Sequence, residues 1–374
     1  MSLYIPGMIP DLRTPALLLD VAKVERNCRR MRERLQAEGV TLRPHVKTAK
    51  NVEVARMALG APIGPITVST LREAEYFFGH GFKDILYAVG IVPAKLDRVV
   101  ELARQGADIA VIVDSVGAAV AVAKLGGRVH ALIEIDSDGH RAGIQPGDAR
   151  LLEVGRALGT AMRGVMTHAG DSYNCANVDG IRAVAARERL AVVACANALQ
   201  ASGIACPVVS VGSTPTATFA DSFEGVTEVR VGVYVFQDLV MAGLGVCSVD
   251  HIALSVAASV IGHQRDKQWL ITDGGWMALS RDRGTGRQKV DQGYGVVCDE
   301  AGRPIDDLIV SGANQEHGIV ARRGGGAIDF DRFAIGTPLR VLPNHACATA
   351  AQYDHYEVFE GGKRVARWER ANGW

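Results

Sequence analysis

The sequence predicts an α/β protein in which a TIM (β/α)8 barrel is followed by a β-rich C-terminal domain. Up to about residue 234, short runs of β-branched residues alternate with longer amphipathic stretches, which is typical of parallel β/α units. These runs supply eight strand candidates, the number that a TIM barrel requires. Beyond about residue 247 the helical pattern ends, and short apolar runs are separated by glycine-rich turns.

The N-terminal elements follow one another in the order expected of a barrel. A first strand at 16–19 and a helix at 21–37 come before the eight candidates. We expect those strands at 41–45, 66–69, 85–88, 109–113, 130–136, 164–168, 208–211 and 228–231. Ser115 is suited to cap one intervening helix, and Thr70 with Glu73 forms a capping box before another. An open nucleotide-binding sheet is disfavoured, since no G-x-G-x-x-G follows the first strand and no phosphate-loop motif occurs.

The second domain is predicted from six further strands with hardly any helix among them. They are expected at 252–261, 269–272, 293–298, 308–311, 339–342 and 356–360. The barrel is therefore assigned to residues 15–247 and the β-rich domain to residues 248–374. Residues 1–14 are a candidate segment to pair with the second domain.

Composition restricts the kind of partner. The 41 Lys and Arg residues equal the 41 Asp and Glu residues in number, and neither sign forms a long run, which argues against a nucleic-acid partner. The N-terminus lacks a secretory pattern and no apolar run is long enough for a membrane span, so we expect a cytoplasmic protein without a membrane partner. The seven cysteines are scattered and contain no C-x-x-C, which argues against a disulfide framework. A small-molecule substrate is the expected partner.

Polar residues gather where the predicted barrel strands end, which is where TIM barrels place their reacting groups. The first barrel strand runs into His45 and Lys47. A lysine at such a strand end is a candidate covalent catalyst, because burial or a nearby positive charge lowers its pKa. Lys50, three residues later, is expected to be an ordinary solvated charge. Two later strands run into Arg141 and into His168, and Tyr173 follows the latter.

The ends of the last two barrel strands are typical of a phosphate site. Gly212 permits close backbone approach, Ser213 and Thr214 supply hydrogen-bond donors, and the eighth strand ends in Gly232 and Tyr234. A simple turn with a helix cap explains the Gly212 segment equally well. Beside a barrel lysine, a phosphate cup would suit pyridoxal phosphate, a phosphorylated aldehyde cofactor.

A histidine and a cysteine two residues apart, His345 and Cys347, form a candidate metal pair in the second domain. If this segment is a strand, both side chains point to one face, and a nitrogen and a sulfur ligand together suit Zn²⁺. By itself the pattern is better explained by a buried histidine beside a buried cysteine.

Four motifs in this order make the chain resemble a known family. They are Arg43-Pro44-His45-Val46-Lys47, Asp138-Gly139-His140-Arg141-Ala142-Gly143, Val211-Gly212-Ser213-Thr214-Pro215-Thr216 and Pro343-Asn344-His345-Ala346-Cys347. The chain is similar, over nearly its whole length, to the fold type III pyridoxal-phosphate enzymes of the D-serine dehydratase and D-threonine aldolase group. The resemblance implies an alanine-racemase-like barrel, a homodimer and a metal at His345 and Cys347.

The same resemblance implies a role for each residue at the barrel mouth. Lys47 would hold the cofactor, with His45 in the same site. The residues implied near the cofactor phosphate are Gly212, Ser213, Thr214, Gly232 and Tyr234, and those around its ring are Arg141, His168 and Tyr173.

By resemblance the activity would be dehydration of D-3-hydroxy amino acids, such as D-threo-3-hydroxyaspartate or D-serine, to a 2-oxo acid and ammonia. Lys47 would remove the α-proton, and the metal, expected to be Zn²⁺, would bind the β-hydroxyl. Candidates to bind a second substrate carboxylate are Arg141, Arg281, Arg283 and Arg287.

Other activities stay open from the sequence. One is retro-aldol cleavage to glycine and an aldehyde, although aldolases of this family tend to carry aspartate where this chain has Cys347. A non-catalytic carrier of pyridoxal phosphate would leave the second domain without a purpose. A racemase would leave the metal pair without one. Glu316 and His317 are compatible with a substrate-side role or with a plain loop.

Overall fold

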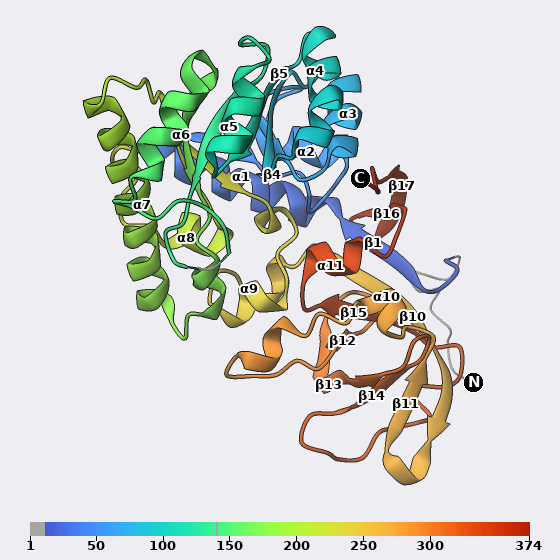
Figure 1. Cartoon of the computed structure of the whole chain (residues 1–374). Helices are drawn as coiled ribbons and strands as arrows, with labels where there is room; N and C mark the ends of the chain where they lie inside the picture. Colours follow the sequence, from blue (N-terminus) through green and yellow to red (C-terminus); the bar gives the residue numbers. More distant parts are fainter. Residues whose placement is uncertain (1–11, 140) are drawn as a thin grey trace. The chain divides into compact units, whose positions relative to one another are not determined.

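The computed structural model describes residues 12–139 and 141–374 and divides the chain into two compact units (Figure 1). One unit comprises residues 28–234 and 371–374, and the other comprises residues 1–27, described from 12 onwards, and 235–370. His140, inside one of the four motifs, lies outside the described residues.

The first unit is the predicted barrel. Its eight parallel strands are β2 (Thr41–Pro44), β3 (Ile66–Val68), β4 (Asp84–Gly90), β5 (Asp108–Val113), β6 (His130–Ile135), β7 (Met162–Thr167), β8 (Val208–Val211) and β9 (Glu228–Val231). They are hydrogen-bonded in the order β2-β9-β8-β7-β6-β5-β4-β3. The ring closes where His45 bridges Thr67 and the Val46 amide donates to the Thr67 carbonyl at 2.9 Å. The TIM-barrel prediction is therefore confirmed.

Helices alternate with these strands and lie around them in Figure 1. They are the C-terminal part of α1 (Val21–Ala37), α2 (Val52–Leu59), α3 (Leu71–Gly79), α4 (Leu96–Arg104), α5 (Val116–Ala123), α6 (Arg150–Leu158), α7 (Val178–Ala201) and α8 (Thr214–Phe219), with 3-10 turns η1 (Pro93–Lys95), η2 (Gly159–Ala161) and η3 (Gly170–Asn174). Ser115 and Thr70 cap α5 and α3 as expected, each accepting a backbone N–H with its side-chain oxygen.

One face of the barrel sheet carries apolar side chains on some strands and polar or charged side chains on others. The register places Leu132 beside Gly164 and Met166 beside Ser210, and Leu132 and Met166 belong to one buried apolar cluster. The same register places Ser210 beside Glu228 and Arg43 beside Arg230, since side chains on strands alternate faces with period two. Strands β8, β9 and β2 therefore carry polar groups on the face where Leu132 and Met166 are apolar.

The second unit is built on a nine-stranded sheet of order β11-β14-β13-β12-β15-β10-β1-β16-β17. Its strands are β1 (Ala16–Asp20), β10 (Leu254–Gln264), β11 (Trp269–Thr272), β12 (Gly295–Cys298), β13 (Pro304–Ala313), β14 (Gly318–Arg322), β15 (Pro338–Pro343), β16 (His355–Glu360) and β17 (Lys363–Glu369). Short helices α9 (Leu239–Gly243), α10 (Trp276–Leu279) and α11 (Ala346–Ala350) accompany it. The predicted β-rich domain is confirmed, but β14 and β17 were not predicted.

The structure divides the chain differently from the expected boundaries of 15–247 and 248–374. Strand β1 pairs antiparallel with β10 and parallel with β16, so the segment at 16–20 lies in the sheet of the second unit. Just before it, the Thr14 hydroxyl donates to Asp273 at 2.5 Å. Residues 1–11 of the segment expected to pair here lie outside the described residues.

Candidate functional site

The turn after β2 carries Lys47. Its charge lowers the pKa values of both His45 and His168, so the three side chains lie within electrostatic range of one another. Gly232 packs against this turn, because a Cβ on Gly232 would lie 2.9 Å from the His45 carbonyl and 3.0 Å from the Thr48 hydroxyl. Strand β9 thus approaches the lysine turn closely only because its end carries glycine.

Lys50 is not the solvated charge that the sequence led us to expect. Its Nζ lies 3.1 Å from Oε1 of Glu73, whose side chain is fully buried, while the Lys50 side chain is only 17% exposed. The second oxygen of Glu73 accepts the Ser69 amide at 2.8 Å. A buried carboxylate requires such a partner, and the ion pair links the lysine turn to the end of β3.

The His168 ring is oriented by a hydrogen bond to Gly212, which follows the adjacent strand β8. Its Nδ1–H donates to the Gly212 carbonyl at 2.6 Å, which leaves Nε2 as the unprotonated nitrogen. Burial lowers the pKa of His168 to about 3, helped by the charges of Lys47, Arg141 and Arg230 and opposed by the bond to Gly212. The ring is therefore neutral at pH 7, and the Tyr173 ring lies 6.3 Å from it.

His45 is neutral for the same reason. Burial, and after it the charges of Lys47 and Arg230, lower its pKa well below 6.5. Its Nε2 lies 3.4 Å from the Ser69 hydroxyl, whereas its buried Nδ1 has no hydrogen-bond partner among the described residues. This nitrogen is thus available to a bound group.

Not every donor of the predicted phosphate cup is free. The Gly212 amide donates to Glu188 at 2.9 Å, and a Gly212 Cβ would lie 1.8 Å from the Arg230 carbonyl, so this glycine serves close strand packing. The Ser213 hydroxyl caps α8 by accepting the Thr216 amide at 3.2 Å. These two roles support the turn-and-cap explanation for Gly212 and Ser213.

Two buried hydroxyls nevertheless fit an anionic group. Oγ1 of Thr214 and the phenolic oxygen of Tyr234 are buried and have no hydrogen-bond partner in the described part of the chain. A buried polar group without a partner costs about 1–3 kcal/mol. Phosphate oxygens accept hydrogen bonds from hydroxyls, so the residues present at this end of the barrel suit the phosphate of a cofactor.

Arg141 is more exposed than a ring contact requires. Its side chain is 52% exposed, and its Nη2 lies 3.7 Å from Oε1 of Glu134, a buried carboxyl at the end of β6. Burial raises the pKa of Glu134, and the charges of Arg141 and Arg230 oppose that rise. Arg141 is thus held towards the barrel end by a carboxyl that the sequence did not single out.

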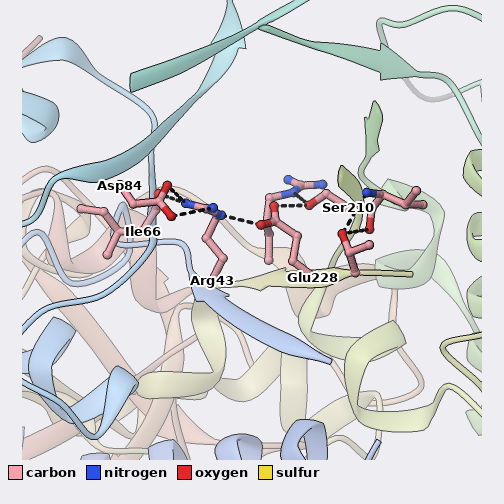
Figure 2. A network of polar contacts seen from close by, with 8 residues as sticks. Arg43, Ile66, Asp84, Ser210 and Glu228 are labelled. Atoms are coloured by element: carbon pink, nitrogen blue, oxygen red, sulfur yellow. Dashed lines mark hydrogen bonds and ion pairs between the residues drawn. The ribbon is translucent and has the colours of Figure 1, made fainter. Parts of the chain in front are cut away.

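A charged network beneath the site was also missed (Figure 2). Arg43 binds Asp84 at 2.7 Å and Glu228 at 2.7 Å. The Ser210 hydroxyl donates to Glu228 at 2.7 Å and accepts from Arg230 Nε at 2.8 Å. The signal was present as alternating charges in Glu228-Val229-Arg230-Val231, since a charge on an inward strand position needs a buried partner.

The candidate metal pair lies at the start of a helix rather than on a strand, so the expected geometry was wrong. His345 is the N-cap residue of α11, and Cys347 lies in the first turn. The two side chains are still within hydrogen-bond distance of each other, so they do converge. Among the described residues there is no group of three or more His, Cys, Asp and Glu side chains suited to a metal, which leaves this pair as a two-ligand candidate.

Two carboxylates that the sequence did not reveal support the pair. The Nδ1–H of His345 donates to Asp282 at 2.6 Å, which leaves Nε2 for a metal. Asp238 is buried and accepts the Ala346 amide at 3.0 Å, which fixes the turn between the two candidate ligands. Burial lowers the pKa of His345, but hydrogen bonds with Asp282 and Cys347 outweigh burial and raise it to about 11. Surroundings that attract a proton so strongly also suit a divalent cation.

The remaining candidates separate by their contacts. Arg283 is paired with Asp291 at 2.6 Å, whereas the Arg281 guanidinium stacks over Trp276 at 5.1 Å and has no ion pair in the part of the chain that the structure describes. Glu316 and His317 are exposed in the turn that joins β13 to β14.

Comparison with known proteins places this geometry in a family. Residues 19–239 match the model described as "Alanine racemase, N-terminal domain", and residues 253–359 match "Putative serine dehydratase domain". The chain is 53% identical to D-threo-3-hydroxyaspartate dehydratase from Delftia sp. (strain HT23), over 97% of this chain and 98% of that protein. The chain belongs to the fold type III pyridoxal-phosphate enzymes.

A solved structure and two more distant relatives extend the comparison. The solved structure of the Delftia dehydratase superposes with a TM-score of 0.95 at 52% identity, covering 98% of this chain and 100% of that one. D-serine dehydratase from Dictyostelium discoideum is 29% identical over 96% of each chain. D-threonine aldolase from Filomicrobium marinum superposes with a TM-score of 0.80 at 26% identity, covering 96% of each chain. Dehydratases and aldolases are lyases, so the chain belongs to a family of lyases.

Two solved structures are variants of D-threo-3-hydroxyaspartate dehydratase. In one a histidine is replaced by alanine, and in the other a cysteine two positions later is replaced, giving a structure described as the metal-free form. The same spacing separates His345 from Cys347 in this chain.

Across the described residues, no helix combines the length and the apolar character needed to cross a bilayer.

Proposed function

We propose that this protein is a pyridoxal-phosphate- and metal-dependent dehydratase of D-3-hydroxy amino acids, with D-threo-3-hydroxyaspartate as a principal substrate. The products would be a 2-oxo acid and ammonia. The observation that carries the proposal is 53% identity to the Delftia dehydratase over 97% of this chain. This chain also has a His-x-Cys pair, His345 and Cys347. We also propose a homodimer, which rests on the family resemblance, and a cytoplasmic location.

Lys47 is proposed to hold the cofactor. The unpartnered hydroxyls of Thr214 and Tyr234 would bind its phosphate, with Gly212, Ser213 and Gly232 framing that end of the barrel. The residues proposed around the ring are His45, Arg141, His168 and Tyr173. When bound, pyridoxal phosphate supplies an electron sink for the substrate α-carbon.

The proton chemistry is assigned to Lys47. Burial keeps His45 and His168 neutral at pH 7, so Lys47 is the basic group of this cluster that can take up the substrate α-proton. The fixed tautomer of His168, with Nδ1–H bound to Gly212, presents an acceptor nitrogen rather than a second acid.

The metal is assigned to His345 and Cys347, and the nitrogen and sulfur donors favour Zn²⁺. When bound there, the ion supplies Lewis-acid stabilisation for the departing β-hydroxyl. Asp282 orients His345 through Nδ1, and Asp238 holds the turn by its bond to the Ala346 amide.

Arg281 is the arginine that we propose for a second substrate carboxylate. It follows from the pairing of Arg283 with Asp291 and from the position of Arg281 next to Asp282, which binds His345. We expect Arg281→Met to lower kcat/KM for D-threo-3-hydroxyaspartate by about 10- to 100-fold, the effect of one charge-assisted hydrogen bond, and to leave D-serine turnover almost unchanged. Arg283→Met is the matched control and should change neither; equal losses on both substrates would refute the assignment.

Product analysis tests the proposed activity. D-threo-3-hydroxyaspartate, D-serine and D-threonine are each incubated with the holoenzyme before and after chelation of divalent metal. We expect oxaloacetate and ammonia from the first substrate, pyruvate and ammonia from the second, and loss of both after chelation. Glycine with an aldehyde, and no ammonia, would establish the aldolase instead. Full activity without metal would refute the role of His345 and Cys347.

A further inference from the structure

Glu188 is a buried carboxyl that the proposed reaction does not use. It lies near the middle of α7 with 2% of its surface exposed, on the buried side of a helix whose other buried residues include Val184 and Val192. A carboxylate in such a place costs several kcal/mol unless hydrogen bonds satisfy it. What it binds therefore reveals why it is there.

Its partners belong to two different loops of the barrel end. Oε1 of Glu188 accepts the Ala169 amide at 3.2 Å and the Gly212 amide at 2.9 Å. Ala169 follows the end of β7 and Gly212 follows the end of β8. Thr216, in the first turn of α8, also hydrogen-bonds to the carboxyl. One carboxyl oxygen thus joins the backbone at Ala169 to the backbone at Gly212, 43 residues further along the chain.

These loops carry the groups proposed to surround the cofactor. His168 precedes Ala169 and donates its Nδ1–H to the carbonyl of Gly212. Glu188 therefore binds the amide next to the donor residue and the amide of the acceptor residue itself. The Ser172 hydroxyl lies 2.8 Å from the Ser213 hydroxyl and ties the loops a second time. Removing the carboxyl would free two buried amides and the ring orientation that depends on them.

We propose that Glu188 is a positioning residue that fixes the His168 loop against the Ser213 loop and so shapes the cofactor end of the barrel. The assignment rests on the proposed cofactor site. Glu188 acts through hydrogen-bond acceptance, so a glutamine oxygen can replace it, with the amide NH₂ turned towards the Thr216 hydroxyl.

The test compares Glu188→Ala with Glu188→Gln and with Val192→Ala, a truncation one helical turn away on the same buried side. Pyridoxal-phosphate affinity is measured by equilibrium titration, and the bound cofactor by its visible absorption and circular dichroism. We expect the alanine variant to bind the cofactor roughly tenfold or more weakly with an altered spectrum, because the buried amides of Ala169 and Gly212 lose their acceptor. Glu188→Gln should restore both, and Val192→Ala should change stability alone.

A double variant separates positioning from stability. If Glu188 acts through His168, the double variant Glu188→Ala/His168→Asn should lose less cofactor affinity than the sum of the two single losses. Wild-type affinity in Glu188→Ala, or the same loss in Val192→Ala, would overturn the assignment. If the wild type binds no pyridoxal phosphate, the proposed function fails instead, and amide exchange of Ala169 and Gly212, slow in wild type and fast in Glu188→Ala, still decides the role of Glu188.

Discussion

At the residue scale, His168 and His345, the histidines proposed for the cofactor and the metal, are both oriented by a hydrogen bond from Nδ1–H. The Nδ1–H of His168 donates to a backbone carbonyl and that of His345 donates to a carboxylate, each at 2.6 Å. In His168 the acceptor fixes the tautomer, and in His345 it orients the ring so that Nε2 is the nitrogen left for a metal. The difference in acceptor fits the difference in proposed task, because a carboxylate makes the His345 nitrogen more basic towards a metal, whereas at His168 burial outweighs the bond to a neutral carbonyl and leaves the ring uncharged.

Asp282→Asn tests this arrangement at the metal pair. The amide can turn its oxygen towards Nδ1 but lacks the negative charge, so we expect the metal dissociation constant to rise about 10- to 100-fold. Chelator competition measures it without reference to turnover. Asp291→Asn is the control, since that carboxylate binds Arg283 in the same loop and not His345. Unchanged metal affinity in Asp282→Asn would show that the carboxylate does not support the ligand.

A second residue-scale prediction concerns pH and His168. Its pKa of about 3 lies below its ordinary value of 6.5, so the unfolded chain binds more protons in this range and stability falls as the pH drops below about 6.5. At pH 5 the loss should be about 2 kcal/mol from this residue. Urea unfolding of the cofactor-free protein at pH 7 and pH 5 measures it, and His168→Asn should lose about 2 kcal/mol less than wild type. Equal losses would contradict a buried, neutral ring.

At the element scale, the site depends on the ends of strands, and these were predictable where turns and apolar runs are sharply bounded. Strands β8, β9 and β11 have the expected limits, since glycine or an equally clear break follows each run. The edge strand β17 was missed because Lys363-Arg364-Val365 begins it with charges typical of a solvated loop. The His345-x-Cys347 spacing suggested a strand, but Asn344 and the bond from Ala346 to Asp238 end β15 and start α11.

Gly232→Ala tests how closely β9 approaches the lysine turn. The added methyl would meet the His45 carbonyl at 2.9 Å and the Thr48 hydroxyl at 3.0 Å, and backbone yields poorly. We expect a loss of about 1–3 kcal/mol in unfolding free energy, together with weaker cofactor binding at Lys47. Gly117→Ala in α5 meets nothing within 4 Å and should stabilise by about 0.5–1 kcal/mol. If Gly232→Ala bound cofactor normally, the turn would not depend on this contact.

At the scale of the whole molecule, the barrel and the β-rich unit each bring one half of the proposed chemistry. The residue types at the strand ends singled out Lys47 and His168 as candidates, whereas the interpretation of His345 and Cys347 as a metal pair needed the family resemblance. The sequence could not show that Glu188, Glu228 and Arg230 are buried together with partners from distant strands, because such pairs depend on register and closure of the barrel. Nor could local patterns place β1, whose partners β10 and β16 lie more than 200 residues further along the chain.

The most direct test of the proposed function is the fate of the substrate α-hydrogen. D-threo-3-hydroxyaspartate carrying deuterium at Cα is incubated with the holoenzyme, and products and solvent are examined by mass spectrometry. If Lys47 removes this hydrogen during dehydration, the deuterium is lost from the carbon skeleton, oxaloacetate and ammonia form, and Lys47→Ala releases none. Glycine that retains the deuterium would show cleavage of the Cα–Cβ bond instead and would contradict a dehydratase.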